Sequence, residues 1–329
     1  MINFALLGAG RIGKMHAKII SDHSEANLQY VYDVNNEFTL QVAKDNNAEV
    51  ANSPKEAVNH KDVDAILIAS AKPTHTEFLI MANEANKPVL CEKPIDLDIN
   101  KVNECRDKIA GSSNLIQIGF NRRFDNSHAK VQQAYVNGEI GTLEKIIITS
   151  RDPAPPGLDY LNAAGGFFRD TTIHDFDLSR FILGEDPIIE ISAFGDNLFD
   201  ENAKKANDFD TAMFILKSKS GVLIHINNSR RAVYGYDQRV EIFGSKGMMI
   251  SNNQTPTSVE KYTEHSTSSK DPIYNFFIER YKEAYYLQLH DLAGLVTKKK
   301  KPRADFNDGH QALILAIAAA KSLKLKKIV

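Results

Sequence analysis

Cysteine is scarce in this chain: Cys91 and Cys105 are the two cysteines among 329 residues. Two cysteines do not make a disulfide framework, and these two lack the clustered partners that a zinc site requires. An excess of charge of one sign is also missing, because 40 lysines and arginines stand against 42 aspartates and glutamates. A net charge of −2 gives no electrostatic basis for binding nucleic acid or an anionic membrane.

Long apolar runs are absent too, since no segment reaches the roughly 18 apolar residues that span a bilayer. The N-terminus leads directly into a predicted strand without the basic flank of a secretory signal, so we expect a cytoplasmic protein. The lysine cluster 298–301 is better explained as a solvated loop after a helix than as a targeting signal, given the neutral remainder of the chain. The length suits two domains of ordinary size.

Three glycines, Gly8, Gly10 and Gly13, follow the N-terminal apolar run. Before a helix, Gly8 permits a tight turn, Gly10 lets backbone N–H groups approach a pyrophosphate, and Gly13 lets the helix pack against its strand. The helix N-terminus, which begins with Arg11 and Ile12, then holds the anion. An ordinary glycine turn is the alternative, but a preceding strand, a following helix and a well-spaced acid favour a dinucleotide site.

That acid is Asp33, which ends a second apolar run and follows Gly13 by 20 residues. A carboxylate at this position accepts hydrogen bonds from a ribose diol and repels a 2′-phosphate. The next residues, Val34, Asn35 and Asn36, offer no arginine to clamp a phosphate. The sequence therefore predicts NAD rather than NADP as cofactor.

Helix and strand patterns alternate through the first third of the chain. Helices are predicted at 36–46, 76–86 and 98–110, and strands at 65–69, 89–91 and 115–119. The strand at 65–69 is continuously apolar, as expected where helices cover both faces of a sheet. We predict a Rossmann-type, doubly wound parallel sheet over residues 1–121, with cofactor-binding residues beyond the strands' carboxyl ends at Ser70, His75, Glu92 and Lys93.

The pattern changes after residue 121. Strands are predicted at 143–150, 188–194, 210–216, 222–228 and 239–243, with hairpin turns at 220–221 and 244–247. Helices are predicted at 173–183, 274–296 and 309–323. Residues 122–329 should thus form a second, α+β domain with a mainly antiparallel open sheet, and the polar stretch 251–270 should be a flexible excursion.

Two motifs carry candidate chemistry. Lys93 would lie at the mouth of a parallel strand, where it serves as a base only if its pKa falls from near 10.4, or else donates a hydrogen bond to a substrate oxygen; the alternative is a surface lysine before a proline turn. Asp170 and His174 are four residues apart and would share a helix face, an arrangement that poises an imidazole as a general base. Helix capping with a core histidine is equally compatible with Asp170 and His174. A metal site formed by His174, Asp175 and Asp177 is disfavoured, because no further His/Cys pair completes a ligand set.

Together these motifs resemble the glucose–fructose oxidoreductase, inositol dehydrogenase and MocA-like family, through residues 8–13, 92–94 and 170–174. The likeness covers nearly the whole chain, and segments 150–156, 172–177 and 234–247 resemble the inositol dehydrogenase branch. Ser150 departs from relatives that carry a histidine before the corresponding arginine, which leaves the stereoisomer of the substrate open.

The resemblance implies a catalytic set in which His174 takes a hydroxyl proton, Asp170 orients His174, and Lys93 holds the reacting oxygen while hydride passes to NAD. It also implies that a cyclic polyol pocket is lined by four residues, Arg122, Asp152, Tyr236 and Tyr285. The expected substrate is myo-inositol, with scyllo-inositol, chiro-inositol or a pyranose sugar as alternatives. An NAD-sensing protein without activity is a further alternative, against which the intact catalytic set argues. Family members commonly pair through the open sheet, so a homotetramer is expected.

Overall fold

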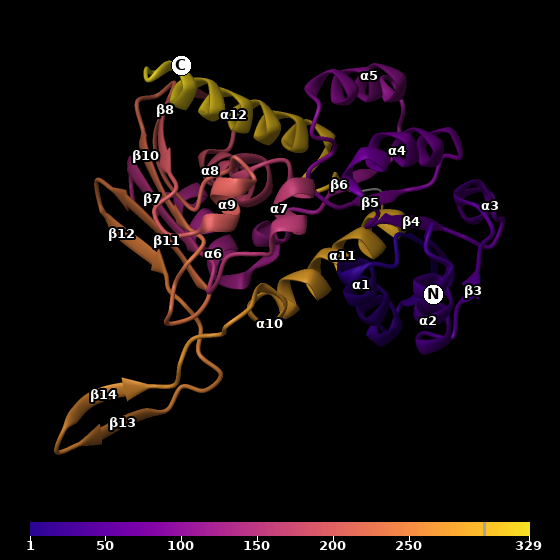
Figure 1. Ribbon diagram of the computed structural model, residues 1–329, viewed down its shortest axis with the longest axis horizontal. Helices are drawn as coiled ribbons and strands as arrows, with labels where there is room; N and C mark the ends of the chain where they lie inside the picture. The colour runs from indigo at the N-terminus through magenta and orange to yellow at the C-terminus, as the bar shows by residue number, and fades with distance from the viewer. Residues whose placement is uncertain (299–300) are drawn as a thin grey trace. The chain divides into compact units, whose positions relative to one another are not determined.

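The computed structural model of the protein describes residues 1–298 and 301–329 (Figure 1). The chain forms two compact units, the first comprising Met1–Phe124 with Ala284–Leu313 and the second Asp125–Glu283 with Ile314–Val329. Segment Ala284–Leu313 therefore packs with the N-terminal residues, while a boundary of independently folding domains at 121/122 stays a prediction. Within the predicted lysine-rich loop, Lys299 and Lys300 lie outside the described residues.

The first unit contains a six-stranded parallel sheet in the order β3-β2-β1-β4-β5-β6. Its strands are β1 (Ile2–Leu7), β2 (Ala26–Tyr32), β3 (Glu49–Val50), β4 (Ala65–Ile68), β5 (Val89–Cys91) and β6 (Ile116–Ile118). The order reverses beside β1, and this is the place where ligands of doubly wound sheets bind. The predicted Rossmann sheet is confirmed.

Helices surround this sheet: α1 (Arg11–Asp22), α2 (Asn36–Asp45), α3 (Pro54–Asn59), α4 (His75–Glu84) and α5 (Ile99–Ile109), with the short 3₁₀ turns η1 (Lys72–Thr74) and η2 (Asn121–Phe124). Two longer helices follow later in the chain, α11 (Lys282–Lys298) and α12 (Phe306–Leu325). Leu289 and Leu292 of α11 join Phe4, Leu67 and Leu90 in one buried core. Among the described residues, no helix has the length and apolar character that crossing a bilayer would take.

The second unit contains a six-stranded sheet in the order β12-β11-β7-β10-β9-β8. Its strands are β7 (Leu143–Arg151), β8 (Ile188–Asp196), β9 (Thr211–Ser218), β10 (Leu223–Ser229), β11 (Asp237–Gly244) and β12 (Gly247–Ser251). Only the β7–β10 pair is parallel among these neighbouring strands. The predicted mainly antiparallel sheet is confirmed.

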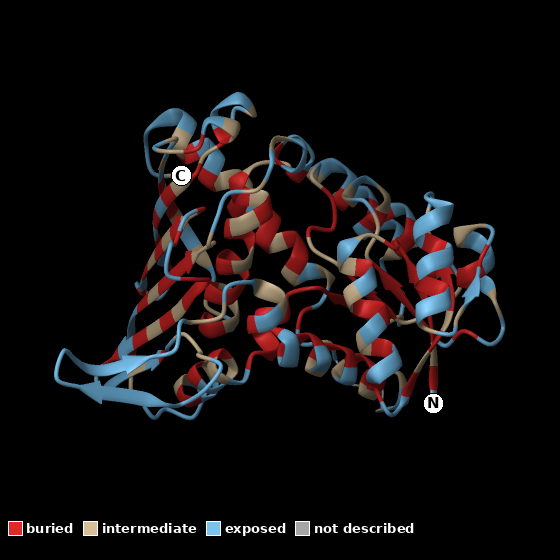
Figure 2. Cartoon of the chain, turned by 60° about the horizontal axis from the view of Figure 1, so that its bottom comes forward, coloured by how far each residue is buried: buried red, intermediate tan, exposed pale blue. Residues whose placement is uncertain are grey.

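The two faces of this sheet differ. Alternate residues of β9, such as Phe214 and Leu216, are buried, and they pack with Phe176 and Ile182 of α8 (Ile173–Leu183) in a second core. The intervening residues of β9 point to the opposite face, which includes exposed apolar side chains such as Met213. Figure 2 shows the resulting alternation of buried and less buried residues along the strands. The remaining helical elements are α6 (Asn126–Val136), α7 (Leu158–Ala164), the π-helical η3 (Phe168–Thr172), α9 (Glu201–Lys205) and α10 (Phe277–Arg280).

The helix predicted over 274–296 starts too early and is not continuous. The carbonyl of Tyr274 accepts the N–H of Tyr236, which keeps this residue in a non-helical pairing. One turn, α10, ends at Arg280, and α11 begins at Lys282. Tyr281, between them, has φ −111° and ψ 17°, outside the regular helical values.

The predicted excursion 251–270 contains a two-stranded hairpin, β13 (Glu260–Thr263) and β14 (Ser266–Lys270), that projects from the second unit in Figure 1. All residues of both strands are exposed (Figure 2). Hydrogen bonds from Lys270, Ser268 and Tyr262 lower the pKa of Glu260 to about 2. The hairpin is thus held by its own polar contacts rather than by a core.

Candidate active site

The turn between β1 and α1 shows three different uses of glycine. Gly8 has φ +108°, and a Cβ added there would lie 2.4 Å from the backbone of Ala69 and Ser70. A Cβ on Gly13 would lie 1.9 Å from the carbonyl oxygen of Gly8, so α1 packs directly on the turn. At Gly10 an added Cβ would meet no protein atom within 4 Å. The protein thus leaves open the position where a phosphate would approach the backbone.

The N-terminus of α1 faces this open position. Gly10 is its N-cap and provides no side-chain hydrogen bond to the first turn, in which Arg11 and Ile12 are the first two residues. The first N–H groups of a helix have no partner within the helix, and with the helix dipole they favour an anion. The loop and the helix together offer space and N–H donors for an anion, and the binding of a pyrophosphate here stays a prediction.

Asp33 follows β2 and holds the glycine turn in place. Its Oδ2 accepts the N–H of Ala9 at 2.7 Å, and its Oδ1 accepts the N–H of Asn35 at 2.8 Å. Each carboxylate oxygen has a second lone pair, so hydrogen bonds from a ribose diol remain possible. Asp33 can therefore both support the loop and select the cofactor.

Ser70 and His75 follow β4. The Ser70 hydroxyl is 2.7 Å from that of Thr74, while the buried His75 ring has Nδ1 2.9 Å from the carbonyl of Pro94 and Nε2 3.0 Å from that of Ser70. Burial lowers the pKa of His75, although both carbonyls favour its protonated form. Through its contact with Pro94, His75 stabilises the turn that contains Lys93. A direct contact of His75 with the cofactor stays a prediction.

Glu92 and Lys93 follow β5, and the Lys93–Pro94 peptide bond is cis. The carboxylate of Glu92 lies 2.7 Å from Nε2 of the buried His16. A Cβ on Gly119 would lie 2.7 Å from Glu92 Oε2, so this glycine provides room for the carboxylate. Because β1, β2, β4 and β5 are parallel, all ten predicted cofactor residues lie after strands that end at one edge of the sheet.

Asp170 and His174 belong to the second unit. Asp170 is a buried residue of η3, and His174 is the second residue of α8. The hydroxyl of Tyr160, on α7, lies 2.9 Å and 3.1 Å from the two carboxylate oxygens of Asp170. The sequence motifs do not indicate Tyr160. The nearest signal was the Gly-Gly pair at 165–166, which ends its helix.

The residue after His174, Asp175, is held in place by buried hydrogen bonds. Asp175 is fully buried, and its carboxylate accepts hydrogen bonds from the hydroxyl of Ser150 at 2.6 Å and the amide of Asn228 at 2.8 Å. Asn228 in turn accepts a hydrogen bond from Thr172 at 2.7 Å. This network attaches the start of α8 to β7 and β10. Asp175 therefore has a structural role, and Ser150 contributes to it by donating a hydrogen bond to Asp175.

The four residues predicted to line the substrate pocket fall in both units. In the first, Arg122 is buried in η2, and Tyr285 packs edge-on against His16 with ring centroids 5.7 Å apart. In the second, Asp152 donates its N–H to Ser229 at 2.9 Å, and Tyr236 packs edge-on against Tyr281 at 6.0 Å. Their contact with a substrate stays a prediction.

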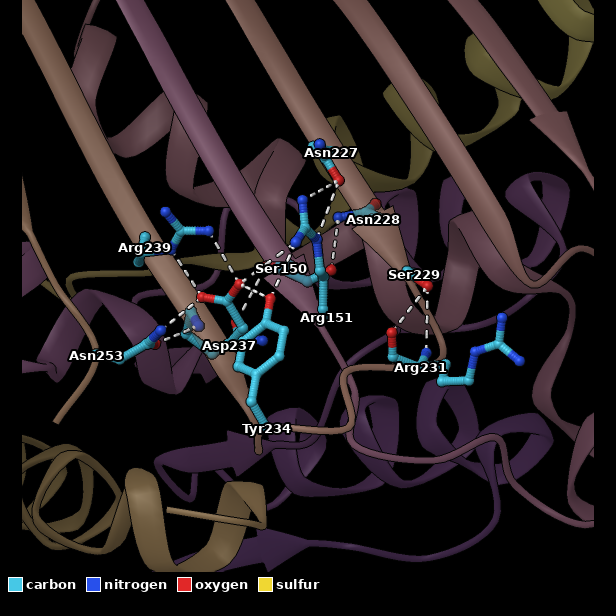
Figure 3. Close-up of polar contacts among 11 residues, drawn as sticks. Ser150, Arg151, Asn227, Asn228, Ser229, Arg231, Tyr234, Asp237, Arg239 and Asn253 are labelled. Atoms are coloured by element: carbon cyan, nitrogen blue, oxygen red, sulfur yellow. Dashed lines mark hydrogen bonds and ion pairs between the residues drawn. The ribbon is translucent and has the colours of Figure 1, made fainter. Parts of the chain in front are cut away.

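A polar cluster occupies the open face of the second sheet (Figure 3). Asp237 accepts hydrogen bonds from Arg239 at 2.8 Å, Tyr234 at 2.6 Å and Asn253 at 2.6 Å, and Arg151 donates to Tyr234 at 2.9 Å. Burial tends to raise the pKa of Asp237, but these hydrogen bonds outweigh it and the pKa lies below its usual value. The motif residues Arg151 and Asp237 therefore stabilise the sheet surface.

Among the described residues, one group of side chains could hold a metal ion. It consists of His23, Glu25 and His290, whose potential ligand atoms lie within 4.8 Å of one another. His23 Nδ1 accepts the N–H of Glu25 at 3.1 Å, so the ring proton is on Nε2, which donates to His290 Nδ1 at 3.1 Å. Burial and the neighbouring His290 lower the pKa of His23. The group is therefore a hydrogen-bonded histidine pair in this structure.

Comparison with known proteins decides the family. The profile of an oxidoreductase family with an NAD-binding Rossmann fold, GFO/IDH/MocA, matches residues 2–120, and that of the GFO/IDH/MocA C-terminal domain matches residues 128–250. The chain belongs to the GFO/IDH/MocA oxidoreductase family. The resemblance inferred from the motifs is thus confirmed, and the chain is an NAD-dependent dehydrogenase.

Relatives within this family are similar over their full length. The myo-inositol 2-dehydrogenase of Thermotoga maritima is 41 % identical, over 100 % of this chain and 98 % of that protein. The crystal structure of a myo-inositol dehydrogenase from Corynebacterium glutamicum is 43 % identical, with a TM-score of 0.95 over 100 % of this chain and 98 % of that one. A scyllo-inositol dehydrogenase from Lactobacillus casei, solved with NAD(H) and scyllo-inositol, is 29 % identical, with a TM-score of 0.91 and coverage of 100 % and 98 %.

Proposed function

We propose that this GFO/IDH/MocA oxidoreductase oxidises the 2-hydroxyl of myo-inositol to a ketone, giving scyllo-inosose, with NAD as the oxidant. The observation that carries the proposal is a sequence identity of about 40 % to an inositol 2-dehydrogenase and a myo-inositol 2-dehydrogenase over nearly the full chain. The same chain also has Lys93, Asp170 and His174 at the positions that the family motifs predict. A non-enzymatic NAD sensor would have no need for all three.

The residues present fit NAD. Open space beside Gly10, the N-terminus of α1 and the free lone pairs of Asp33 suit a pyrophosphate and a ribose diol. When bound, NAD supplies a nicotinamide ring that accepts a hydride. The protein's part is to bind the cofactor, exclude a 2′-phosphate by the charge of Asp33, and orient the alcohol.

The roles of the catalytic set follow from the chemistry of an alcohol. Its hydroxyl proton must leave as the carbon loses hydride, so a base of near-neutral pKa accelerates the reaction. We assign this proton transfer to His174 and the orientation of His174 to Asp170. Lys93 donates a hydrogen bond to the reacting oxygen. Arg122, Asp152, Tyr236 and Tyr285 are proposed to bind the remaining hydroxyls.

A second substrate has support of its own. The Lactobacillus casei relative is a scyllo-inositol dehydrogenase, and this isomer differs from myo-inositol in the orientation of one hydroxyl. Individual pocket contacts of about 1–3 kcal/mol are enough to switch between such isomers. The two candidate substrates would therefore undergo the same reaction, and the contacts in the pocket would decide between them.

The test is a substrate panel. Purified protein is incubated with NAD and with myo-, scyllo- and chiro-inositol, glucose and xylose, and NADH is followed by absorbance. We expect the highest kcat/KM with myo-inositol, and a faster reaction with scyllo-inositol would assign the second candidate. Absence of turnover with every compound, combined with tight NAD binding, would indicate a sensor.

We also propose a cytoplasmic homotetramer that acts in inositol catabolism. The open face of the second sheet supports association, because it exposes apolar side chains that include Phe194, Met213, Ile215 and Leu223. Light scattering coupled to size-exclusion chromatography measures the oligomeric state. A monomer at micromolar concentration would contradict the proposal.

A further inference from the structure

The hydroxyl of Tyr160 lies within hydrogen-bond distance of both oxygens of the proposed catalytic carboxylate, Asp170. The phenol oxygen lies 2.9 Å from Oδ2 and 3.1 Å from Oδ1 of Asp170. Asp170 is only 8 % exposed, whereas Tyr160 is 41 % exposed. A largely buried carboxylate is thus hydrogen-bonded by a side chain that reaches it from the surface.

The local sequence determines where this hydroxyl lies. Helix α7 is short, and its buried residues Leu161 and Ala164 anchor it to the second unit. Gly157 caps its start after two prolines, and Gly165 ends it with φ +85°. Gly166, with φ +89°, then turns the chain into the segment that leads to η3. The end of α7 is therefore defined by left-handed backbone conformations that residues other than glycine rarely adopt.

The hydrogen bond has a direct consequence for the carboxylate. A phenol donating to a carboxylate forms a charge-assisted bond, which is stronger than a bond between neutral groups. The phenol has one proton, so it restrains the rotation of the carboxylate through a single hydrogen bond. A carboxylate that must orient an imidazole benefits from such a restraint, because small errors of position are costly in catalysis.

We propose that Tyr160 is a positioning residue of the dehydrogenase reaction, which holds the carboxylate of Asp170 in the orientation that His174 requires. The inference rests on the proposed function, because it assigns Tyr160 a role only through Asp170. Tyr160 acts through Asp170 and takes no part in the proton transfer itself. Neither the glycine motif nor the Asp170–His174 spacing indicates this role of Tyr160.

The test is a double-mutant cycle with the polyol that the wild-type protein oxidises fastest. Tyr160→Phe should lower kcat about tenfold or more, the usual effect of losing a hydrogen bond to a charged group, and leave KM for NAD unchanged. In an Asp170→Ala background, Tyr160→Phe should change kcat less than about twofold, since the group it positions is gone. Asp170→Asn serves as the background if the alanine variant does not fold.

A matched control is Tyr262→Phe, which removes a hydroxyl that donates to Glu260 at 2.8 Å in the exposed hairpin. It should leave kcat and both KM values unchanged. Wild-type activity of Tyr160→Phe would overturn the inference and leave the proposed function standing. Equal losses in both backgrounds would also overturn it, since they indicate a structural effect. Full activity of Asp170→Ala would overturn the proposed role of Asp170 and this inference together.

Discussion

Nε2 of His16 lies 2.7 Å from Oε1 of Glu92, a residue 76 positions later in the chain. His16 is on α1, behind the glycine turn, and Glu92 immediately precedes Lys93. A carboxylate only accepts hydrogen bonds, so the ring proton of His16 is on Nε2. This pair connects α1 to the end of β5 inside the first unit.

We expect His16→Ala to destabilise the protein by about 3 kcal/mol, because it leaves a largely buried carboxylate without its donor. Denaturant unfolding measures the change. His16→Gln is the control, since its amide can still donate, and it should recover part of the loss. Equal unfolding free energies for wild type and His16→Ala would show that the pair contributes nothing.

The glycine turn predicts opposite effects for two similar changes. Gly10→Ala should fold normally, because its Cβ meets no protein atom within 4 Å, yet it should weaken NAD binding by about tenfold, or 1.4 kcal/mol. Gly13→Ala should lower the stability by about 3 kcal/mol, since its Cβ would collide with the turn. Thermal unfolding and NAD titration of both variants test this. The reverse order of effects would contradict our account of the loop.

Asp33→Ala should weaken NAD binding and reduce the preference for NAD over NADP by about tenfold, because a repelling charge is removed. The ratio of kcat/KM for the two cofactors is the measurement. The hydrogen bond from Ala9 to Asp33 is lost as well, so both cofactors should bind less tightly than NAD does to the wild type. An unchanged ratio would remove Asp33 as the discriminating residue.

Lys93→Ala should lower kcat by roughly 100-fold or more, the range typical of a lost catalytic hydrogen-bond donor or base. NAD affinity should stay nearly intact, because the proposed role of Lys93 is to hold the substrate oxygen. Steady-state kinetics and a separate NAD titration distinguish the two effects. A collapse of NAD binding would assign Lys93 to the cofactor instead.

The stability should depend on pH through His75. Burial lowers the pKa of His75 below its ordinary 6.5, so the unfolded chain binds a proton more readily than the folded protein. Stability is therefore fully present above about pH 6.5 and decreases as the pH falls from there toward the lower, folded-state pKa. His75→Gln should flatten this dependence in unfolding experiments between pH 5 and 7.5. The slope should not vanish, because burial also lowers the pKa of His23.

Patterns that are local in sequence were sufficient for much of the fold. Continuous apolar strands with intervening helices predicted the parallel sheet, and strand-like runs joined by hairpin turns predicted the open sheet. The helix predicted from residue 274 failed because a backbone hydrogen bond from Tyr236 to Tyr274 overrides local propensity. Helices α3, α7 and α9 were missed because each is too short for helical periodicity to be detected, and α6, of 11 residues, was missed as well.

The sequence by itself determined the glycine turn, the acid at the end of β2, the strand before Lys93 and the helix that contains His174, because these depend on spacing along one or two neighbouring elements. The tertiary structure alone decided the partners of those residues. Tyr160 on Asp170, His16 on Glu92, and Ser150 with Asn228 around Asp175 are side-chain contacts that depend on three-dimensional packing. Packing also placed segment Ala284–Leu313 with Met1–Phe124 in the first unit, although these two stretches are far apart in the sequence. Periodicity fixes which face of an element is buried, but not which distant residue that face meets.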